Sequence, residues 1–123
     1  VGDATAIKIV TNLISAQVVQ ALSEAMAITK AAGLSEQLLI DAVSSNACGS
    51  PLAALKMPSM AAGEYEPHFS VENMRKDSAF AIELAEKLGL ETPGIKAANR
   101  VMTDRCEAGD ADLDYCAMYR QFS

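Results

Sequence analysis

Apolar residues recur at helical spacing through the first third of the chain, which carries no proline between Gly2 and Gly33. The series consists of Ile7, Val10, Ile14, Val18, Leu22, Ala25 and Ile28. We predict a single helix over residues 5–32, on the order of 40 Å long at about 1.5 Å per residue. Gly33 stands where a C-terminal cap glycine is expected.

The apolar residues of this stretch go almost all round the predicted helix, because Ile9 and Leu13 face away from Val18 and Leu22. Between Lys8 and Lys30 the only charged residue is Glu24. A helix with apolar residues on every side is buried on several sides. We therefore expect other helices, or another subunit, to surround it.

Capping residues divide the rest of the chain into shorter helices. The expected starts are Ser35, Ser50-Pro51, Ser70 and Thr92-Pro93, and the last helix opens near Asp110, Asp112 and Asp114. Pro58 is expected to bend or restart the third helix, Gly89 to end the fourth, and the fifth to end near Ala108. Expected buried positions include Met57, Met60, Leu88, Ala97 and Phe122. No segment has the pattern of a strand, so we predict an all-α fold of five to six helices around the long first one, in a single domain over residues 1–123.

Composition narrows the class of protein. Half of the 123 residues are hydrophobic but only 5% are aromatic, which favours close-packed helices over a sandwich or barrel. The net charge of −6 argues against nucleic acid and against an anionic membrane surface as partners. Gln17, Gln20 and Glu24 interrupt the first helix, so we expect no membrane span.

The cysteine count is odd, at three, and no pair has metal-ligand spacing, which argues against a disulfide framework or a zinc site. A reduced, cytoplasmic setting is the default, and we expect the cysteines to be small buried hydrophobes. With one histidine, metal or histidine-base chemistry has little to use, and we expect no metal. No glycine-rich phosphate loop is present in the sequence.

One polar stripe interrupts the apolar start of the first helix. Lys8, Thr11, Asn12 and Ser15 fall on one side of its first two turns, and Lys8 and Asn12 are neighbours at i and i+4. A lysine and an amide in a buried helix cost free energy unless a partner satisfies them. The stripe is therefore either a site for a small anionic or carbonyl ligand, or simply the solvated first turns of the helix.

Two further groups could carry chemistry. The first is Phe69 followed by Lys76-Asp77, whose two charged side chains point about 100° apart on a helix and must find separate partners. The alternative is that Lys76 and Asp77 are simply solvated charges on the helix surface. The second is the acidic run over residues 109–114, which lacks the spacing and closing Glu of an EF-hand, so capping aspartates are favoured over a calcium loop.

Taken together, the three groups resemble the C-terminal domain of the β-hydroxyacid dehydrogenases. The start is similar to the family's K-x-x-N-N helix, here Lys8-Ile9-Val10-Thr11-Asn12. The middle is similar to its G-x-F-x-P-x-F-x-L…K-D segment, here residues 63–71 and then Lys76-Asp77. The end is similar to its G-x-x-D-x-S-A segment, here Gly109 with Asp114-Tyr115-Cys116-Ala117. The resemblance covers essentially the whole chain and implies the fold of the 6-phosphogluconate dehydrogenase C-terminal domain.

The resemblance also implies roles for individual residues in an NAD(P)-dependent interconversion of a short β-hydroxyacid and its semialdehyde or keto form. Lys8 would be the general acid/base, which a lysine in a desolvated, crowded pocket can be. Asn12 would hold the hydroxyl or carboxylate end of the substrate, and Phe69 would wall the pocket. Lys76 would reach NAD or NADP near the nicotinamide, and Asp77 would orient that side of the site.

The sequence departs from the family pattern in places. Thr11 replaces the first Asn of the pair and Cys116 replaces a serine. The family's dinucleotide-binding Rossmann domain is expected to precede residue 1, and without it we expect no dehydrogenase activity.

Two alternatives stay open, a non-catalytic helical dimerisation or interaction module and a 6-phosphogluconate-type domain. A homo-oligomer through the first helix is expected in either case. The exact substrate, the choice between NAD and NADP, and the oligomer stoichiometry are left open.

Overall fold

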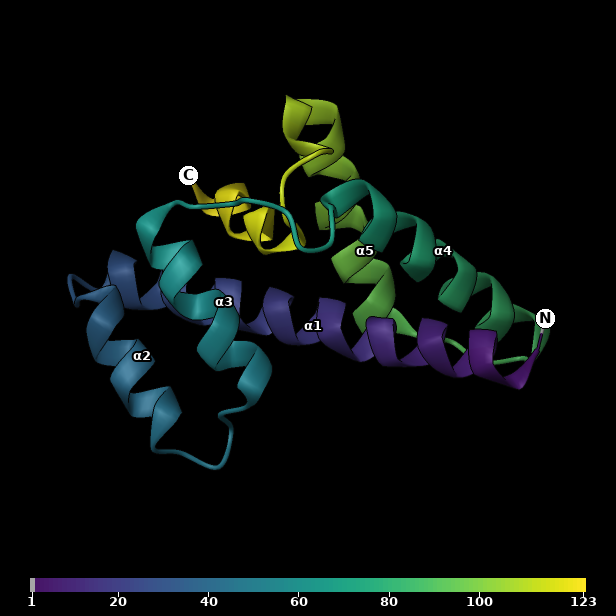
Figure 1. Cartoon of the computed structure of the whole chain (residues 1–123), viewed down its shortest axis with the longest axis horizontal. Helices are drawn as coiled ribbons and strands as arrows, with labels where there is room; N and C mark the ends of the chain where they lie inside the picture. The colour runs from purple at the N-terminus through teal and green to yellow at the C-terminus, as the bar shows by residue number, and fades with distance from the viewer. Residues whose placement is uncertain (1) are drawn as a thin grey trace.

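The computed structural model describes residues 2–123, which fold into five α-helices followed by a π-helical turn and a 3-10 helix (Figure 1). The elements are α1 (Asp3–Ala31), α2 (Glu36–Ser44), α3 (Pro51–Ala62), α4 (Val71–Lys87), α5 (Pro93–Arg105), the π-helical turn η1 (Cys106–Asp110) and the 3-10 helix η2 (Tyr115–Phe122). Within residues 2–123 the only β-type pairing is an isolated antiparallel bridge between Ser70 and Asp114. The all-α prediction is confirmed.

Serine side chains cap three of the helices, as the sequence predicted. The hydroxyls of Ser35, Ser50 and Ser70 each accept a hydrogen bond from the backbone N–H three residues later, at 3.1, 3.0 and 3.1 Å. Such caps satisfy N–H groups that have no partner inside the helix. Thr92 is the exception, because its hydroxyl makes no capping bond, and the start of α5 rests on Pro93 in the first turn.

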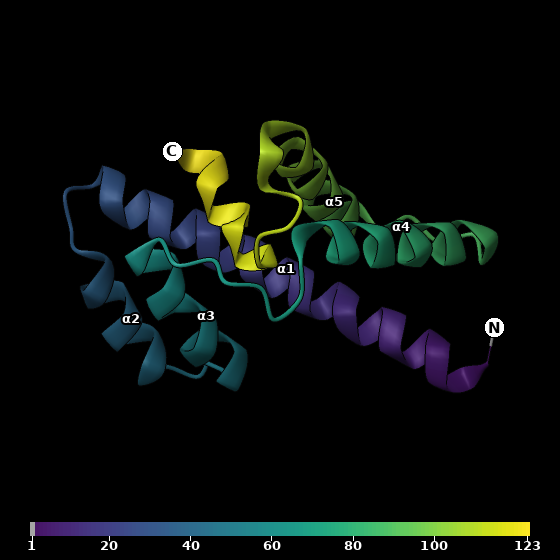
Figure 2. The ribbon, with the colours of Figure 1, turned by 45° about the horizontal axis from the view of Figure 1, so that its top comes forward.

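The long helix α1 is the axis of the molecule, and the other elements lie along it in two groups (Figures 1 and 2). Helices α2 and α3 lie beside its C-terminal half, α4 and α5 beside its N-terminal half, and η2 packs against α1 between the two groups. Four apolar side chains of α1 are almost fully buried in the common core: Ala16, Val19, Leu22 and Met26. The prediction of a long organising helix is therefore confirmed.

The expectation that α1 would be buried on several sides is met only in part, because one face of the helix is uncovered in the described residues. Ile7, Val10 and Ile14 are 63, 42 and 57% exposed, and Ile28 is 70% exposed. The reason is that the other elements, with α2 and α3 on one side of α1 and α4, α5 and η2 on another, leave one face of it uncovered (Figure 2). Its outer face therefore stays apolar and open.

Several local expectations are also corrected. Helix α3 continues through Pro58, because buried Met57 and Met60 hold the turn on both sides of the proline. Leu88 is exposed because α4 ends one residue before it. Phe122 is about half exposed, because only the first five residues of the 3-10 helix η2 are buried.

At the end of α5, the helix stops at Arg105 and passes into the π-helical turn, where Gly109 has a φ of 99°. Ala97 of α5 is exposed, whereas Ala98 beside it is buried. Among the cysteines only Cys116 is buried, since Cys48 lies exposed in the α2–α3 loop and Cys106 is partly exposed.

Length and composition alone would let α1 cross a membrane, because an 18-residue window of it has a mean hydropathy of 1.2. The core helix of a water-soluble fold passes the same test. In this molecule α1 is the helix on which α3, α4, α5 and η2 pack. Length and hydropathy therefore do not by themselves establish a span.

Candidate functional site

The polar stripe predicted on the first turns of α1 is present and largely solvent-facing. Lys8 is exposed, and within residues 2–123 its side chain forms neither an ion pair nor a hydrogen bond. Thr11 turns its hydroxyl back to the carbonyl oxygen of Lys8 at 2.9 Å. The ammonium group of Lys8 is therefore available to a ligand.

Asn12, one turn after Lys8, ties the stripe to α4. Its Nδ2 donates to Oδ2 of Asp77 at 2.7 Å, and the two residues are 65 positions apart in the sequence. Both side chains are partly buried. The bond brings together two groups that the sequence singled out separately, and it leaves the second N–H and the amide oxygen of Asn12 free for other partners.

Lys76 and Asp77 diverge, as their adjacent positions on a helix predicted. The carboxylate of Asp77 faces Asn12 on α1, whereas the Lys76 side chain is 59% exposed and its Nζ lies 4.0 Å from Oε1 of Glu72. At that distance and exposure the Lys76–Glu72 pair is weak. The ammonium of Lys76 can therefore leave Glu72 for an incoming anion.

Phe69 lies apart from these residues, at the N-terminal end of α4. Six residues of α4 lie between it and Asp77, and the helix rises about 9 Å from Val71 to Asp77 at 1.5 Å per residue. Its side chain packs partly against the core. Its backbone N–H donates to Oδ1 of Asp114 at 3.2 Å, and its carbonyl oxygen accepts from the N–H of Tyr115 at 2.9 Å.

Helices α1 and α4 run antiparallel, since Ala6 and Ile9 face Glu83 and Lys87 across a cavity of about 220 Å³ while Asn12 pairs with Asp77 further along. Three features therefore follow one another along α1. The first is the cavity, the second is the Lys8–Asn12 turn, and the third is the N-terminal end of α4, which Phe69 precedes. A substrate that touched all three groups would lie along this face.

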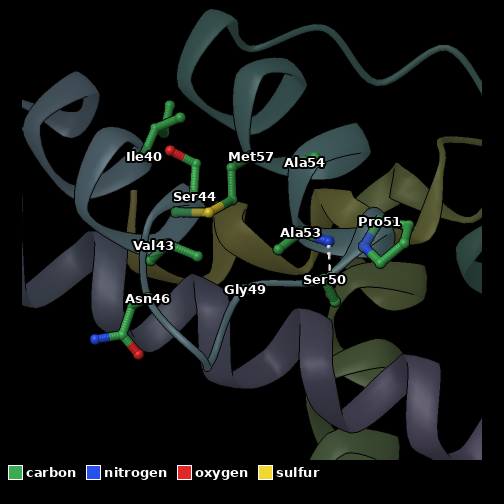
Figure 3. A pocket seen from close by; sticks show the side chains of 10 residues that line it. All are labelled: Ile40, Val43, Ser44, Asn46, Gly49, Ser50, Pro51, Ala53, Ala54 and Met57. Atoms are coloured by element: carbon green, nitrogen blue, oxygen red, sulfur yellow. Dashed lines mark hydrogen bonds between the residues drawn. The ribbon is translucent and has the colours of Figure 1, made fainter.

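A different cavity of about 360 Å³ lies between α2 and α3 and contains none of the predicted site residues (Figure 3). Its lining is mostly apolar, including Ile40, Val43 and Met57. Among the described residues, no charged one lines this cavity. We take the polar stripe as the candidate site because, within residues 2–123, it combines an unpaired cation, Lys8, with the amide of Asn12 and the carboxylate of Asp77.

The sequence did not single out Lys56, which forms the one buried ion pair of the described residues. Its Nζ lies 2.9 Å from Oδ2 of Asp114, and the two side chains are 5 and 2% exposed. Burial raises the pKa of the Asp114 carboxyl, but the Lys56 ammonium and the backbone N–H groups of Cys116 and Phe69 outweigh it and hold the pKa below its usual value. A signal was present, because Lys56 falls on the buried 53-56-57-60 face of its helix.

The acidic run contains a capping aspartate, as the sequence favoured. Asp114 caps η2 by accepting the Cys116 N–H at 3.0 Å. Asp110 is buried and pairs with Arg105 and Arg120, each at 3.3 Å. The two aspartates thus have separate partners and do not converge on one point.

Residues 2–122 match the family model described as NAD-binding of NADP-dependent 3-hydroxyisobutyrate dehydrogenase. The chloroplastic glyoxylate/succinic semialdehyde reductase 2 of Arabidopsis thaliana is 31% identical over 118 residues, which are 96% of this chain and 33% of that protein. The cytokine-like nuclear factor N-PAC of Xenopus tropicalis is 26% identical over 122 residues, 99% of this chain and 23% of the factor.

A solved structure of 3-hydroxyisobutyrate dehydrogenase from Salmonella typhimurium superposes with a TM-score of 0.88 at 26% identity, and covers 94% of this chain and 40% of its own. The chain thus spans less than half the length of each of these proteins. The superposition covers nearly all of the helical fold described above.

Proposed function

Because this chain belongs to the family of the NADP-dependent 3-hydroxyisobutyrate dehydrogenases, which are NAD(P)-dependent β-hydroxyacid dehydrogenases, we propose that it carries the proton-transfer and substrate-binding residues of such an enzyme. In this proposal the helical domain works together with a dinucleotide-binding domain. Its substrate is a short hydroxyacid or the matching semialdehyde, and the Arabidopsis relative is named for glyoxylate and succinic semialdehyde. A cytoplasmic setting stays a prediction.

The observation that carries the proposal is the Asn12–Asp77 hydrogen bond of 2.7 Å. It fixes the amide of Asn12 one helical turn from the exposed ammonium of Lys8. A cation and an oriented amide on adjacent turns can hold the two ends of a small molecule with a carbonyl and a carboxylate. The sequence supplied each group, and the fold joins α1 to α4 at this point.

The reaction assigned to these residues is a proton transfer coupled to a hydride transfer. When bound, the cofactor supplies the hydride to the carbonyl carbon or takes it back. Lys8 donates a proton to the carbonyl oxygen as the new C–H bond forms, which yields the hydroxyl group and a neutral amine. In the oxidative direction the amine takes the hydroxyl proton. Asn12 orients the substrate through its free N–H and amide oxygen.

The described residues could contact the nicotinamide end of a dinucleotide, but they do not form a binding site for its pyrophosphate. Lys76 and Asp77 could border the nicotinamide end, since Lys76 is exposed and only weakly paired. A pyrophosphate cradle needs glycines in front of a helix N-terminus. In residues 2–123 only single glycines precede helices, Gly2 before α1 and Gly49 before the cap of α3. The positive-φ glycines lie at the C-terminal ends of helices: Gly33, Gly63, Gly89 and Gly109.

The open apolar face of α1 supports the expected self-association or contact with the dinucleotide-binding domain. Ile7, Val10 and Ile14 are spaced at i, i+3 and i+7 and lie on the outer side of the helix. Association would remove these side chains from water, at about 25 cal/mol per Å² of apolar surface. Sedimentation of Ile14→Glu, with Glu24→Gln as an exposed control on the same helix, would test this part of the proposal.

The test of the catalytic role is Lys8→Ala in the enzyme that contains this domain together with its dinucleotide-binding domain. General acid–base catalysis contributes about 10²–10⁴-fold, so we expect kcat to fall by that factor while circular dichroism stays unchanged. Lys30→Ala is the matched control, an exposed lysine at the other end of the same helix. Near wild-type turnover of Lys8→Ala would overturn the role of Lys8.

A second candidate is a non-catalytic interaction module, because one relative is named a nuclear factor and not an enzyme. In that case the Lys8 and Lys30 variants would behave alike in every activity assay, and the apolar face of α1 would carry the function.

A 6-phosphogluconate-type role is less well supported. Arg75, one of the few cations near the site, already binds Glu72 through two hydrogen bonds of 3.0 and 2.6 Å. A phosphate would have to displace Glu72 from this guanidinium. Measured selectivity for unphosphorylated acids over sugar phosphates separates the two roles.

A further inference from the structure

The buried ion pair between Lys56 and Asp114 lies beneath the loop that leads into α4. Nζ of Lys56 is 2.9 Å from Oδ2 of Asp114 and 4.9 Å from the centre of the Tyr115 ring. Both charged side chains are almost completely removed from solvent. Burying two charges is costly unless further hydrogen bonds satisfy them, so the contacts of the second carboxylate oxygen matter.

That second oxygen of Asp114 holds the loop directly. Oδ1 accepts the backbone N–H groups of His68 at 3.0 Å and of Phe69 at 3.2 Å. Two backbone hydrogen bonds of 2.9 Å also fix the loop. Tyr115 N–H donates to the Phe69 carbonyl, and Asp114 N–H donates to the Tyr65 carbonyl. The position of Phe69 therefore depends on a carboxylate whose charge Lys56 balances.

The same stretch also reaches the polar stripe on α1. Tyr115 opens η2, which packs against α1. Burial raises the pKa of Tyr115 to about 12, and an interaction with the Ser15 hydroxyl opposes this rise. Ser15 belongs to the stripe that contains Lys8 and Asn12. A displacement of residues 114–115 would therefore alter the contacts of both Phe69 and α1.

We propose that Lys56 and Asp114 are positioning residues, and that the pair sets substrate affinity by holding the backbone of His68 and Phe69 in place. The inference rests on the proposed function, because it takes Phe69 as the wall of the substrate pocket. Its physical basis is that Asp114 offers acceptors to two loop N–H groups and can remain a buried carboxylate only while Lys56 is there.

The test uses two double variants of the full-length enzyme. Each of them replaces both Lys56 and Asp114 with uncharged residues. Lys56→Met with Asp114→Asn keeps an oxygen that can accept the two loop N–H groups, whereas Lys56→Met with Asp114→Ala removes it. Both avoid an unpaired buried charge, so both are expected to fold. In the alanine pair, backbone amide exchange of a peptide spanning residues 64–72 should be about tenfold faster, as expected for loss of such hydrogen bonds.

Kinetics of the same variants test the link to substrate. We expect KM to rise about tenfold in the alanine pair, with kcat changed less than about twofold, and both constants to stay near wild type in the asparagine pair. Asp110→Asn is the control for general loosening, since Asp110 is a buried carboxylate that pairs with Arg105 and Arg120.

Each outcome decides the proposal. Unchanged exchange over residues 64–72 in the alanine pair would overturn it, as would faster exchange without a rise in KM. An equal rise in KM for Asp110→Asn would also overturn it, because the effect would then be general. Failure of the proposed function is seen separately, in the turnover of Lys8→Ala, which leaves the Lys56–Asp114 pair intact.

Discussion

Replacing Lys56 with methionine should destabilise the fold strongly, because it leaves the Asp114 carboxylate buried and without its cation. Breaking a buried pair on one side costs about 3–5 kcal/mol. Asp114 keeps three backbone N–H donors, from His68, Phe69 and Cys116, so we expect the lower end of that range. Domains of this kind are stable by about 5–15 kcal/mol, which makes this loss a large fraction of the total.

Urea unfolding followed by circular dichroism measures the effect. At an m-value of about 2 kcal/mol/M, a loss of about 3 kcal/mol lowers the midpoint by about 1.5 M. Lys56→Met combined with Asp114→Asn should recover most of this loss, because the pair is then removed as a unit. Lys96→Met is the control, since Lys96 pairs with Glu91 at the surface and should cost less than about 1 kcal/mol.

The pH dependence gives an independent check. The folded pKa of Asp114 lies below its ordinary value of 3.8, so its charged form contributes stability above that pH. This contribution is lost as the pH falls through the folded pKa. The wild type should therefore lose more stability between pH 4 and the acid limit than the Lys56→Met, Asp114→Asn double variant does. A Lys56→Met midpoint within experimental error of wild type, or equally unstable single and double variants, would refute the reasoning.

Three further predictions follow from single features of the fold. Asn12→Ala and Asp77→Ala should show a coupling of about 1 kcal/mol in a double-mutant cycle by urea unfolding, and additive effects would mean that the bond is not formed in solution. Gly49→Ala should destabilise by about 1–3 kcal/mol in thermal unfolding, because its Cβ would clash with a backbone oxygen at the end of α2; Gly2→Ala, which meets no atom, is the control. An aromatic disulfide reagent at pH 8 should modify exposed Cys48 quickly and Cys116 only on unfolding, because burial raises the pKa of the Cys116 thiol to about 12; equal rates would contradict the burial.

Much of the candidate site could be predicted from the sequence because several of its residues are neighbours within one helix. The i, i+4 spacing of Lys8 and Asn12 follows from helix geometry alone, and the divergence of Lys76 and Asp77 follows from their adjacency. What spacing cannot supply is the partner across 65 residues. The Asn12–Asp77 bond exists because α4 packs antiparallel to α1, and no local pattern specifies that register.

Helix positions and their caps were decided by the sequence, since Ser35, Ser50 and Ser70 satisfy N–H groups within three residues of themselves. The tertiary structure alone decided which sides of those helices are covered. Helix α1 is apolar nearly all round, yet its neighbours within residues 2–123 leave one face uncovered, and Ile14 is exposed on that face. Likewise the charge of Lys56 gives no hint of burial by itself, because only the arrival of Asp114 from 58 residues away makes a buried ammonium tolerable.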